Sequence, residues 1–354
     1  MSAICKHSDI RRKQHGVRIA ALFLCVLLLM LCTGCGGKQR YSVTYADVFD
    51  TVTTFTAYTE SRAEFDALAE QLHAQLLEDH RRSDIYHEYP GLVNLCTLNK
   101  RAGEEAVQVD GELMDLLQFG ARWHELTGGK LNIAMGAVLA LWQEARETAA
   151  ADPDSARLPD EGRLREAAAH CSMTDLALDT ESGTVRYLDP ELKLDVGAVA
   201  KGWAQSRAME LLDRARCTSW LLNMGGSVSC RGTKPDGSPW TIGLEDPLDK
   251  SLPMRTFLLT DSSAVTSGVD QRYYLVEGKR YHHLIDPDTG FPCDLCTQVT
   301  IILPNPLLAD ALSTALFLMD QEAGSKLARE LGAEALWILP DGSQIKTEGF
   351  PEFN

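Results

Sequence analysis

Basic residues are scarce in this chain of 354 residues, which has 34 lysines and arginines against 50 aspartates and glutamates and a formal net charge of −16. Outside the first 40 residues, no stretch gathers lysines and arginines into a basic stripe. Since binding to nucleic acid depends on neutralising phosphates with such residues, the composition argues against a nucleic-acid partner. The hydrophobic share of 45% is ordinary for a globular protein and is enough for a sizeable core.

Long apolar runs are also rare, and the one that stands out lies near the N-terminus, at residues 19–31. Basic residues precede this run, and it is too short for a comfortable membrane span, which is typical of a signal segment for export. Thr33 and Gly34, directly before Cys35, resemble the end of a bacterial lipobox, although Cys32 stands where that motif usually has leucine. We therefore expect an exported lipoprotein that is lipidated at Cys35, with an uncleaved N-terminal anchor as the alternative.

This interpretation divides the chain into three parts. Residues 1–35 form the signal segment, residues 36–45 form a polar linker, and residues 46–354 form a single domain. The lipid anchor is expected to hold this domain at the outer face of the bacterial cytoplasmic membrane, on the periplasmic side where there is one.

The cysteines give little support for a zinc centre. Two pairs have the C-x-x-C spacing, Cys32/Cys35 and Cys293/Cys296, but the first pair belongs to the targeting segment. The second pair is open to two interpretations, a redox-active pair or a disulfide. Four other cysteines are expected to be buried as small hydrophobic residues: Cys96, Cys171, Cys217 and Cys230.

Strand-like and helix-like patterns are mixed along the body of the chain rather than strictly alternating. A strand-like alternation covers residues 43–58, and apolar residues recur at helical spacing in 61–80, 112–126 and 307–319. Residues 148–163 lack periodicity and predict a surface loop. Further strands are predicted at residues 176–178, 185–188, 220–223, 240–244, 264–266, 299–303 and 336–339. The order predicts an α+β domain with a mixed, largely antiparallel sheet and flanking helices.

Residues 195–202, with the sequence DVGAVAKG, are the most informative part of the body. The apolar pattern changes there from alternation to helical spacing, so the glycines fall at a predicted strand-to-helix junction. The free backbone N–H groups of a helix N-terminus bind anions, and Lys201 adds positive charge. A site for a phosphorylated ligand is one interpretation, and an ordinary turn followed by a surface lysine is the other.

Three further motifs follow in the second half of the chain. Residues 223–227 (NMGGS) place two glycines after an apolar strand, which permits either close approach of a ligand or a plain tight turn. Residues 282–290 (HHLIDPDTG) bring a histidine pair to a turn that can hold an imidazole at the rim of a cleft. Asp310 and Thr314 lie four residues apart on a predicted helix, so their oxygens face the same way and suit Mg²⁺, although such pairs often only form caps or hydrogen bonds.

Together, and in this order, the four motifs resemble those of the ApbE family, the FAD:protein FMN transferases. The first half matches the family more loosely, at residues 49–51, 83–86 and 127–136. The resemblance implies a T-fold-like flavin transferase domain for residues 46–354. It also implies a reaction, in which a threonine or serine hydroxyl of an acceptor protein attacks the FMN-side phosphorus of FAD, releases AMP and becomes covalently linked to FMN.

The resemblance further implies roles for individual residues. The carbonyl of Ala198, the carboxylate of Asp310 and the hydroxyl of Thr314 are expected to bind Mg²⁺, and Asp310 is expected to take part in catalysis. His283 is the candidate that removes the proton from the attacking hydroxyl, while His282 either orients it or is simply exposed. Contacts with FAD are expected from Phe49, Tyr86, Lys130, Leu131, Asn132, Asp195, Lys201, Asn223, Gly225, Gly226, His283 and Leu284.

The chain departs from the family at two places. Residues 131–134 read Leu-Asn-Ile-Ala where the family usually has Phe-Asp-Pro-Thr, which removes a carboxylate and a hydroxyl beside the expected flavin-binding segment. Phe49 and Asp50 stand where Met-Gly is common. Both departures concern contacts with the flavin and leave the metal and diphosphate residues unchanged.

The resemblance implies FAD as substrate and partners outside the cytoplasm, namely acceptor subunits of the Na⁺-translocating NADH:quinone reductase or of Rnf-type complexes, or other FMN-binding domains. Two other functions stay open. One is a Mg²⁺-dependent FAD pyrophosphatase that yields FMN and AMP, and the other is a flavin-binding lipoprotein without chemistry. The intact Lys201, Asp310 and Thr314 favour catalysis, because a passive binder has no need for a metal on the diphosphate.

Overall fold

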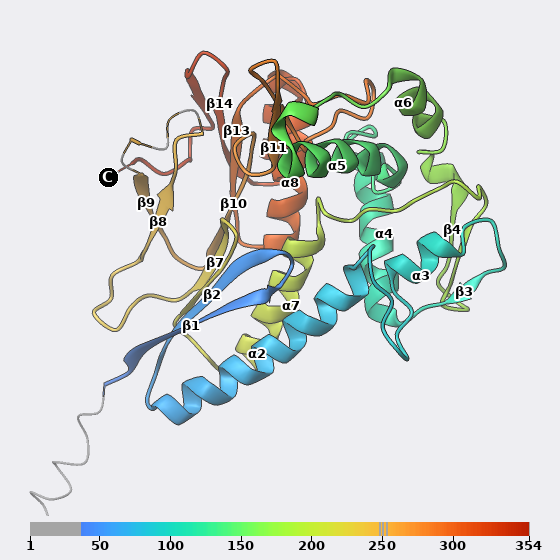
Figure 1. Ribbon diagram of the computed structural model, residues 1–354. Helices are drawn as coiled ribbons and strands as arrows, with labels where there is room; N and C mark the ends of the chain where they lie inside the picture. The colour runs from blue at the N-terminus through green and yellow to red at the C-terminus, as the bar shows by residue number, and fades with distance from the viewer. Residues whose placement is uncertain (1–36, 248, 250, 253, 354) are drawn as a thin grey trace, which may run out of the picture.

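An eight-stranded antiparallel sheet runs through the middle of the computed structural model, which describes residues 37–247, 249, 251–252 and 254–353 (Figure 1). Its order is β1-β2-β6-β7-β10-β13-β14-β15, and every neighbouring pair is antiparallel. The strands are β1 (Gln39–Val48), β2 (Thr51–Thr59), β6 (Trp220–Met224), β7 (Ser227–Arg231), β10 (Ser262–Gly268), β13 (Gln298–Leu303), β14 (Glu334–Ile338) and β15 (Gln344–Lys346). The α+β architecture with a largely antiparallel sheet is confirmed.

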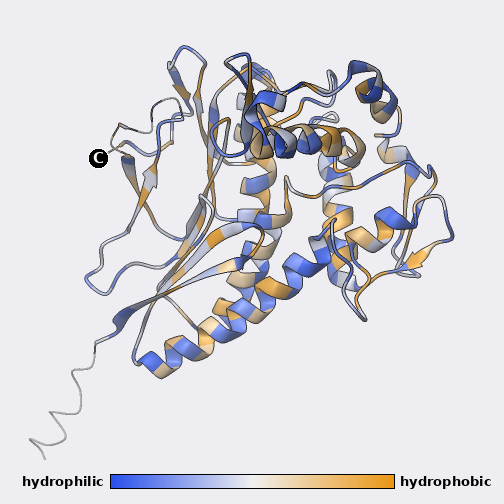
Figure 2. Ribbon diagram, viewed as in Figure 1, coloured by the Kyte–Doolittle hydropathy of each residue, from blue (hydrophilic) through white to orange (hydrophobic). Residues whose placement is uncertain are grey.

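Three long helices lie side by side against one face of this sheet: α2 (Arg62–Ser83), α7 (Ala200–Arg214) and α8 (Pro306–Leu318). Helix α2 covers β1 and β2, α7 contacts β7, and α8 covers β10 and β13. Figure 2 shows blue and orange residues alternating along α2, and three of its large apolar side chains, Phe65, Leu72 and Leu76, are fully buried. The side chain of Ser61 accepts from the Glu64 N–H and caps this amphipathic helix.

The remaining elements surround this layer. The other helices are α3 (Leu95–Lys100), α4 (Gly111–Leu126), α5 (Gly136–Ala151), α6 (Glu161–Ala168) and α9 (Gln321–Glu330), with short 3₁₀ turns at Pro153–Ser155 and Met173–Asp175. Three small sheets consist of β3 (Val107–Gln108), β5 (Thr184–Tyr187) and β4 (Leu176–Asp179); of β8 (Trp240–Leu244) and β9 (Arg255–Leu259); and of β11 (Tyr273–Val276) and β12 (Lys279–His282). The β8–β9 hairpin shares a second hydrophobic core with Val228 and Cys230 of β7.

Three expectations about local structure are wrong. The opening strand at residues 43–58 is a hairpin of two strands, and β1 begins at Gln39, inside the stretch 36–45 that was expected to be a linker. The turn was missed because it has neither glycine nor asparagine. The loop expected at residues 148–163 is helical at both ends, since the alanine-rich start continues α5 to Ala151 and α6 begins at Glu161 after its Asp160 cap.

The expected helices at residues 61–80, 112–126 and 307–319 are confirmed as α2, α4 and α8. Within the described residues, no helix is both long and apolar enough to cross a membrane. The signal segment and Cys35 lie outside the described residues, so the expected lipid anchor stays a prediction.

Candidate functional site

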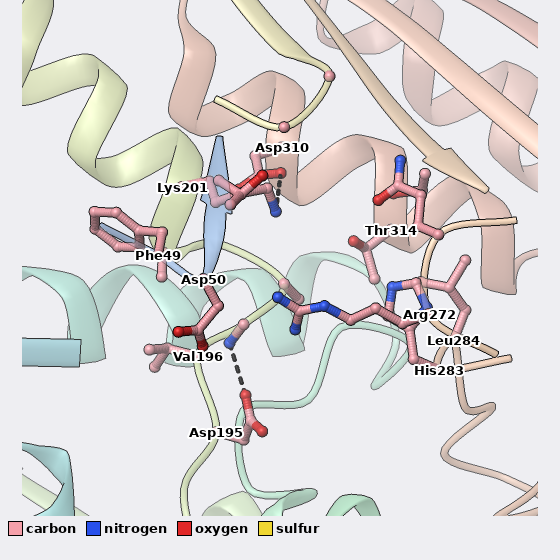
Figure 3. A pocket seen from close by; sticks show the side chains of 18 of the residues that line it. Phe49, Asp50, Asp195, Val196, Lys201, Arg272, His283, Leu284, Asp310 and Thr314 are labelled. Atoms are coloured by element: carbon pink, nitrogen blue, oxygen red, sulfur yellow. Dashed lines mark hydrogen bonds and ion pairs between the residues drawn. The ribbon is translucent and has the colours of Figure 1, made fainter. Parts of the chain in front are cut away.

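A cavity of about 800 Å³ opens where the turns of the main sheet, the start of α7 and the inner face of α8 meet (Figure 3). Every residue that was singled out from the sequence as a metal, FAD or catalytic residue lines it. Residues from positions 49 to 314 are therefore brought to one place by the fold. Their individual roles stay predictions.

Two neighbouring hairpin turns form one wall of the cavity. Phe49 and Asp50 join β1 to β2 with φ angles of 54° and 49°, and Gly225 and Gly226 join β6 to β7 with φ angles of 58° and 94°. The turns are adjacent because β2 pairs with β6, and a Cβ on Gly225 would collide with the Thr51 hydroxyl. Only glycine fits at position 225, as the positive φ and the close approach both require.

The junction at residues 195–202 differs in part from expectation. Helix α7 begins at Ala200, but no regular strand precedes it, because β5 ends at Tyr187 and only an isolated bridge joins Lys193 to Met135. Val199, at the N-cap position of α7, provides no side-chain cap. The first turn of the helix therefore faces the cavity with backbone N–H groups that need acceptors from elsewhere.

Asp310 of α8 supplies one of these acceptors. Its Oδ2 accepts from the Gly202 N–H at 2.7 Å, and its Oδ1 lies 3.7 Å from the Lys201 ammonium. Burial raises the pKa of this 3% exposed carboxyl, while Lys201 and the Gly202 N–H act in the opposite direction. The two helices can approach so closely because residue 202 is glycine; a Cβ there would lie 2.5 Å from that of Asp310.

Because Asp310 accepts the Gly202 N–H, other oxygen atoms at the cavity are left without a hydrogen-bond donor. The Gly202 N–H donates to Asp310 rather than to the carbonyl of Ala198 one turn earlier. Thr314 lies one turn after Asp310 on α8, and its hydroxyl makes no hydrogen bond with another described residue. A carbonyl, a carboxylate oxygen and a hydroxyl thus line the cavity, and hard oxygen donors of these kinds fit Mg²⁺.

A conventional metal cluster is absent from the described part of the chain, since no three or more histidine, cysteine, aspartate or glutamate side chains gather there to hold an ion. Any metal in the cavity has to rely on the mixed oxygen set of Ala198, Asp310 and Thr314, completed by water or ligand oxygens. The expected ligand set is compatible with this finding, because it contains a single carboxylate.

His283 lies directly after β12 and faces the cavity (Figure 3). Its Nδ1 is buried and has no hydrogen-bond partner. Burial and the nearby positive charges of Arg272, Lys201 and Arg146 lower the pKa of His283 to about 3. The imidazole is therefore neutral near pH 7, with a buried nitrogen available to a ligand.

His282 has a different role from its neighbour. It is 7% exposed, its Nδ1 accepts from the Leu284 N–H at 3.2 Å, and its Nε2 donates to the Cys293 carbonyl at 2.9 Å. The expectation that it is simply exposed is wrong. One ring nitrogen holds the backbone directly after His283 and the other ties it to Cys293, so His282 fixes the segment that carries His283.

This arrangement predicts a pH effect on stability. Burial lowers the pKa of His282 from 6.5 to about 4, so the unfolded chain takes up the proton first and stability is lost as pH falls from about 6.5 towards 4. Between about pH 7.5 and about pH 4.5, the wild type is expected to lose about 3 kcal/mol more of its free energy of unfolding than His282→Gln. Denaturant unfolding at the two pH values measures this difference. Equal losses in both proteins would contradict the assignment.

Several expected FAD contacts already hold the cavity wall together. The Lys130 ammonium donates to Asp286 and Asp288, at 2.8 Å each. The Asn132 amide donates to the Cys171 carbonyl and accepts from the Ala134 N–H. An aspartate could not make the first of these two bonds, so the Asn132 departure has a structural consequence.

The other polar residues of the wall are positioned in similar ways. Asn223 accepts from the Gly226 N–H at 2.9 Å and fixes the second hairpin turn. Asp195 accepts from the Gly197 N–H at 2.7 Å, and burial raises the pKa of Asp195 although Arg272 opposes this. Tyr86 donates to Gln143 at 2.7 Å and remains 52% exposed at the cavity.

Two cavity residues, Arg146 and Arg272, were missed from the sequence. Arg272 extends from beside His283 into the middle of the view in Figure 3, and Arg146 comes from α5. Neither forms an ion pair with another described residue, and their mutual repulsion together with burial lowers the pKa of Arg146. The only available signal for Arg272 was its position ten residues before the histidine pair, and it directly precedes a hairpin that was not predicted.

The four scattered cysteines follow the expectations with one exception, and the disulfide interpretation of the Cys293/Cys296 pair is wrong. Cys96, Cys217 and Cys230 are buried, whereas Cys171 is only partly buried. Cys293 and Cys296 are buried free thiols, and both sulfur atoms lie near the Phe317 carbonyl, at 3.4 and 3.8 Å.

Comparison with known proteins places these features in context. The sequence profile of the ApbE family matches residues 49–337. An FAD:protein FMN transferase of Treponema pallidum is 32% identical over 89% of this chain and 90% of its own length, and one from Escherichia coli K12 is 26% identical over 90% and 92%. The crystal structure of the ApbE protein of Thermotoga maritima superposes with a TM-score of 0.78 at 27% identity, covering 88% of this chain and 98% of that one.

Proposed function

Since the chain belongs to the ApbE family, we propose that its cavity is the active site of a flavin transferase, which moves FMN from FAD to a hydroxyl of an acceptor protein. The relatives named FAD:protein FMN transferase match this chain along nearly their whole length. The similarity therefore covers their complete proteins and not one fragment of them. The observation that carries the proposal is the capping of α7 by Asp310, because it leaves oxygen ligands and a lysine together at one cavity wall.

We assign the metal site to the Ala198 carbonyl, the Asp310 carboxylate and the Thr314 hydroxyl. Mg²⁺ bound there would neutralise charge on the diphosphate of FAD. The free oxygens and the burial of Asp310 support this assignment. Lys201 is the second source of positive charge, and it would hold the diphosphate beside the first turn of α7, where Val199 provides no side-chain cap.

His283 is proposed to take the proton of the acceptor hydroxyl on its unpartnered Nδ1. A pKa of about 3 for His283 makes it a weak base in the empty cavity. Three of the groups that lower this pKa are cations, namely Arg272, Lys201 and Arg146, and the negative diphosphate of FAD offsets them. Binding of FAD is therefore expected to raise the pKa of His283 from this value, although burial, the largest cause of the lowering, remains.

A specific assay separates this function from its alternatives. The protein without its signal segment is incubated with FAD, Mg²⁺ and a threonine-containing acceptor domain. Both AMP and the acceptor that carries covalently bound, fluorescent FMN are measured. Transfer predicts that the two products appear in equal amounts. AMP and free FMN without labelled acceptor would instead support the FAD pyrophosphatase, and no AMP at all would contradict both enzymatic functions.

The proposed partners are extracytoplasmic FMN-binding subunits of redox complexes, such as those of the Na⁺-translocating NADH:quinone reductase or Rnf type. A lipid anchor at Cys35 would place the enzyme at the same membrane surface as these subunits. The proposal rests on the lipobox-like residues Thr33 and Gly34 before this cysteine.

Cys35→Ser is expected to move the protein from the membrane fraction to the soluble fraction when the full chain is expressed, because acylation needs the thiol. Metabolic labelling with a fatty acid checks this result, and Cys5→Ser, which lies outside the lipobox-like residues, serves as the matched control that keeps its lipid. Continued labelling of Cys35→Ser would place the anchor elsewhere.

A further inference from the structure

Unpaired positive charges gather beside the cavity, although the chain as a whole carries a net charge of −16. Arg146 and Arg272 line the cavity, and Lys279 and Arg280 belong to β12. None of the four forms an ion pair with another described residue, whereas most cations on the long helices α2 and α7 do. Four cations without an ion pair to a described residue therefore lie in the cavity wall or on the hairpin beside it.

The hairpin of β11 and β12 presents this charge on a defined face. Strand register places Tyr274 opposite Tyr281 on one face and Leu275 opposite Arg280 on the other. The first face packs on α5, where Trp142 contacts both tyrosine rings, so the hairpin is held in place. On the opposite face, Tyr273, Leu275 and Arg280 form what we call the outer face, while His282, opposite Tyr273, is buried against the Cys293 carbonyl.

The outer face has the composition of a binding surface, with two exposed residues and a partly buried arginine. Tyr273 is 39% exposed and Leu275 is 52% exposed, and the Arg280 guanidinium lies 4.4 Å from the centre of the Tyr273 ring. Tyrosine and arginine are enriched among residues that contribute strongly to protein interfaces. The cation–π contact also preorders the arginine for a partner.

This surface is continuous with the active site. Arg272 precedes β11 and lines the cavity, and His283 follows β12 and lines it too. Both ends of the hairpin thus emerge from the cavity rim beside the imidazole that we propose as the base. An acceptor hydroxyl that reaches His283 brings the residues next to it onto this hairpin.

We propose that the outer face of the β11–β12 hairpin, together with Arg272, docks an acidic segment of the acceptor protein that flanks the modified hydroxyl. The inference rests on the proposed transferase function and adds a recognition surface to it. Charge complementarity selects the partner, because carboxylates pair with Arg272 and Arg280 while the acidic remainder of the chain repels them. Leu275 and Tyr273 supply the apolar contact.

A peptide library tests this surface. Synthetic peptides with one central threonine and randomised flanks are incubated with FAD, Mg²⁺ and either the wild type or Arg280→Glu, and flavinylated peptides are identified by mass spectrometry. We expect aspartate and glutamate to be enriched near the modified threonine with the wild type, and Arg280→Glu to lower this enrichment about tenfold. Arg122→Glu, an exposed arginine of α4 that has no ion pair with a described residue, is the control with unchanged enrichment.

Further readouts separate a loss of docking from a loss of folding or of catalysis. Arg280→Gln removes the charge without reversing it and is expected to give an intermediate enrichment, with unchanged FAD affinity in all three variants. Equal distributions for the wild type and Arg280→Glu, no acidic enrichment, or AMP release without any labelled peptide would overturn the docking surface. Absence of AMP in the wild type would instead overturn the proposed function.

Discussion

Asp310→Ala is expected to reduce the rate of FMN transfer by about a thousandfold. The substitution removes the single carboxylate among the proposed metal ligands and also the acceptor that caps the Gly202 N–H. The rate is measured as covalently labelled acceptor formed per unit time over a titration of Mg²⁺. Activity of the wild type rises with Mg²⁺ and saturates, whereas the small residual activity of the variant is expected to be insensitive to the metal.

Loss of the cap and loss of the metal ligand are separated by two further variants. Asp310→Asn keeps an oxygen that accepts from the Gly202 N–H, so it avoids the cost of about 1–3 kcal/mol for an unsatisfied buried donor, yet it lacks the charge that binds Mg²⁺. Thr314→Val keeps the shape of the side chain and removes only its hydroxyl. If Asp310→Asn transferred FMN at the wild-type rate, Asp310 would be a helix cap and not a metal ligand.

His283→Ala is expected to lower kcat for transfer by about two to four orders of magnitude while FAD affinity changes by less than about threefold. The imidazole acts on the acceptor hydroxyl in this account, so its removal affects the chemical step more than the binding of FAD. Single-turnover kinetics measure the first quantity and quenching of flavin fluorescence measures the second.

The chain offers a matched control for this histidine. His124 of α4 also has a buried Nδ1 without a partner, but it does not line the cavity, and His124→Ala is expected to leave both quantities unchanged. A His283→Ala protein that bound FAD weakly and turned over bound FAD at the normal rate would make His283 a binding residue and refute its role as base.

The sequence predicted which residues line the cavity better than it predicted the backbone conformation around them. Helical spacing placed Asp310 and Thr314 on one helix face and turn chemistry explained the glycines at 225 and 226, but their membership of one site came from the family resemblance. The turn at Phe49 and Asp50 was missed because its two positive φ angles occur in residues that rarely adopt them, and tertiary pairing of β1 with β2 imposes them.

Contacts between distant segments were beyond reach for a related reason. The Gly202 N–H finds its acceptor 108 residues away, on another helix, and no local pattern encodes that choice. Arg146 likewise lies on the helix α5, whose end was expected to be a loop, so nothing pointed to its place beside His283. The departure at Asn132 has a structural reason that the sequence did not show, namely the hydrogen bond that its amide donates to the Cys171 carbonyl.

We propose that Ala198, Asp310 and Thr314 hold a metal against the diphosphate of FAD, beside Lys201 and His283. A crystal structure of the protein grown with FAD and Mn²⁺ in place of Mg²⁺ tests it most directly, because the anomalous signal locates the ion independently of the refined coordinates. We expect one anomalous peak in contact with all three oxygens and with a phosphate of FAD. An ion held by other residues, or a flavin bound outside the cavity, would contradict it.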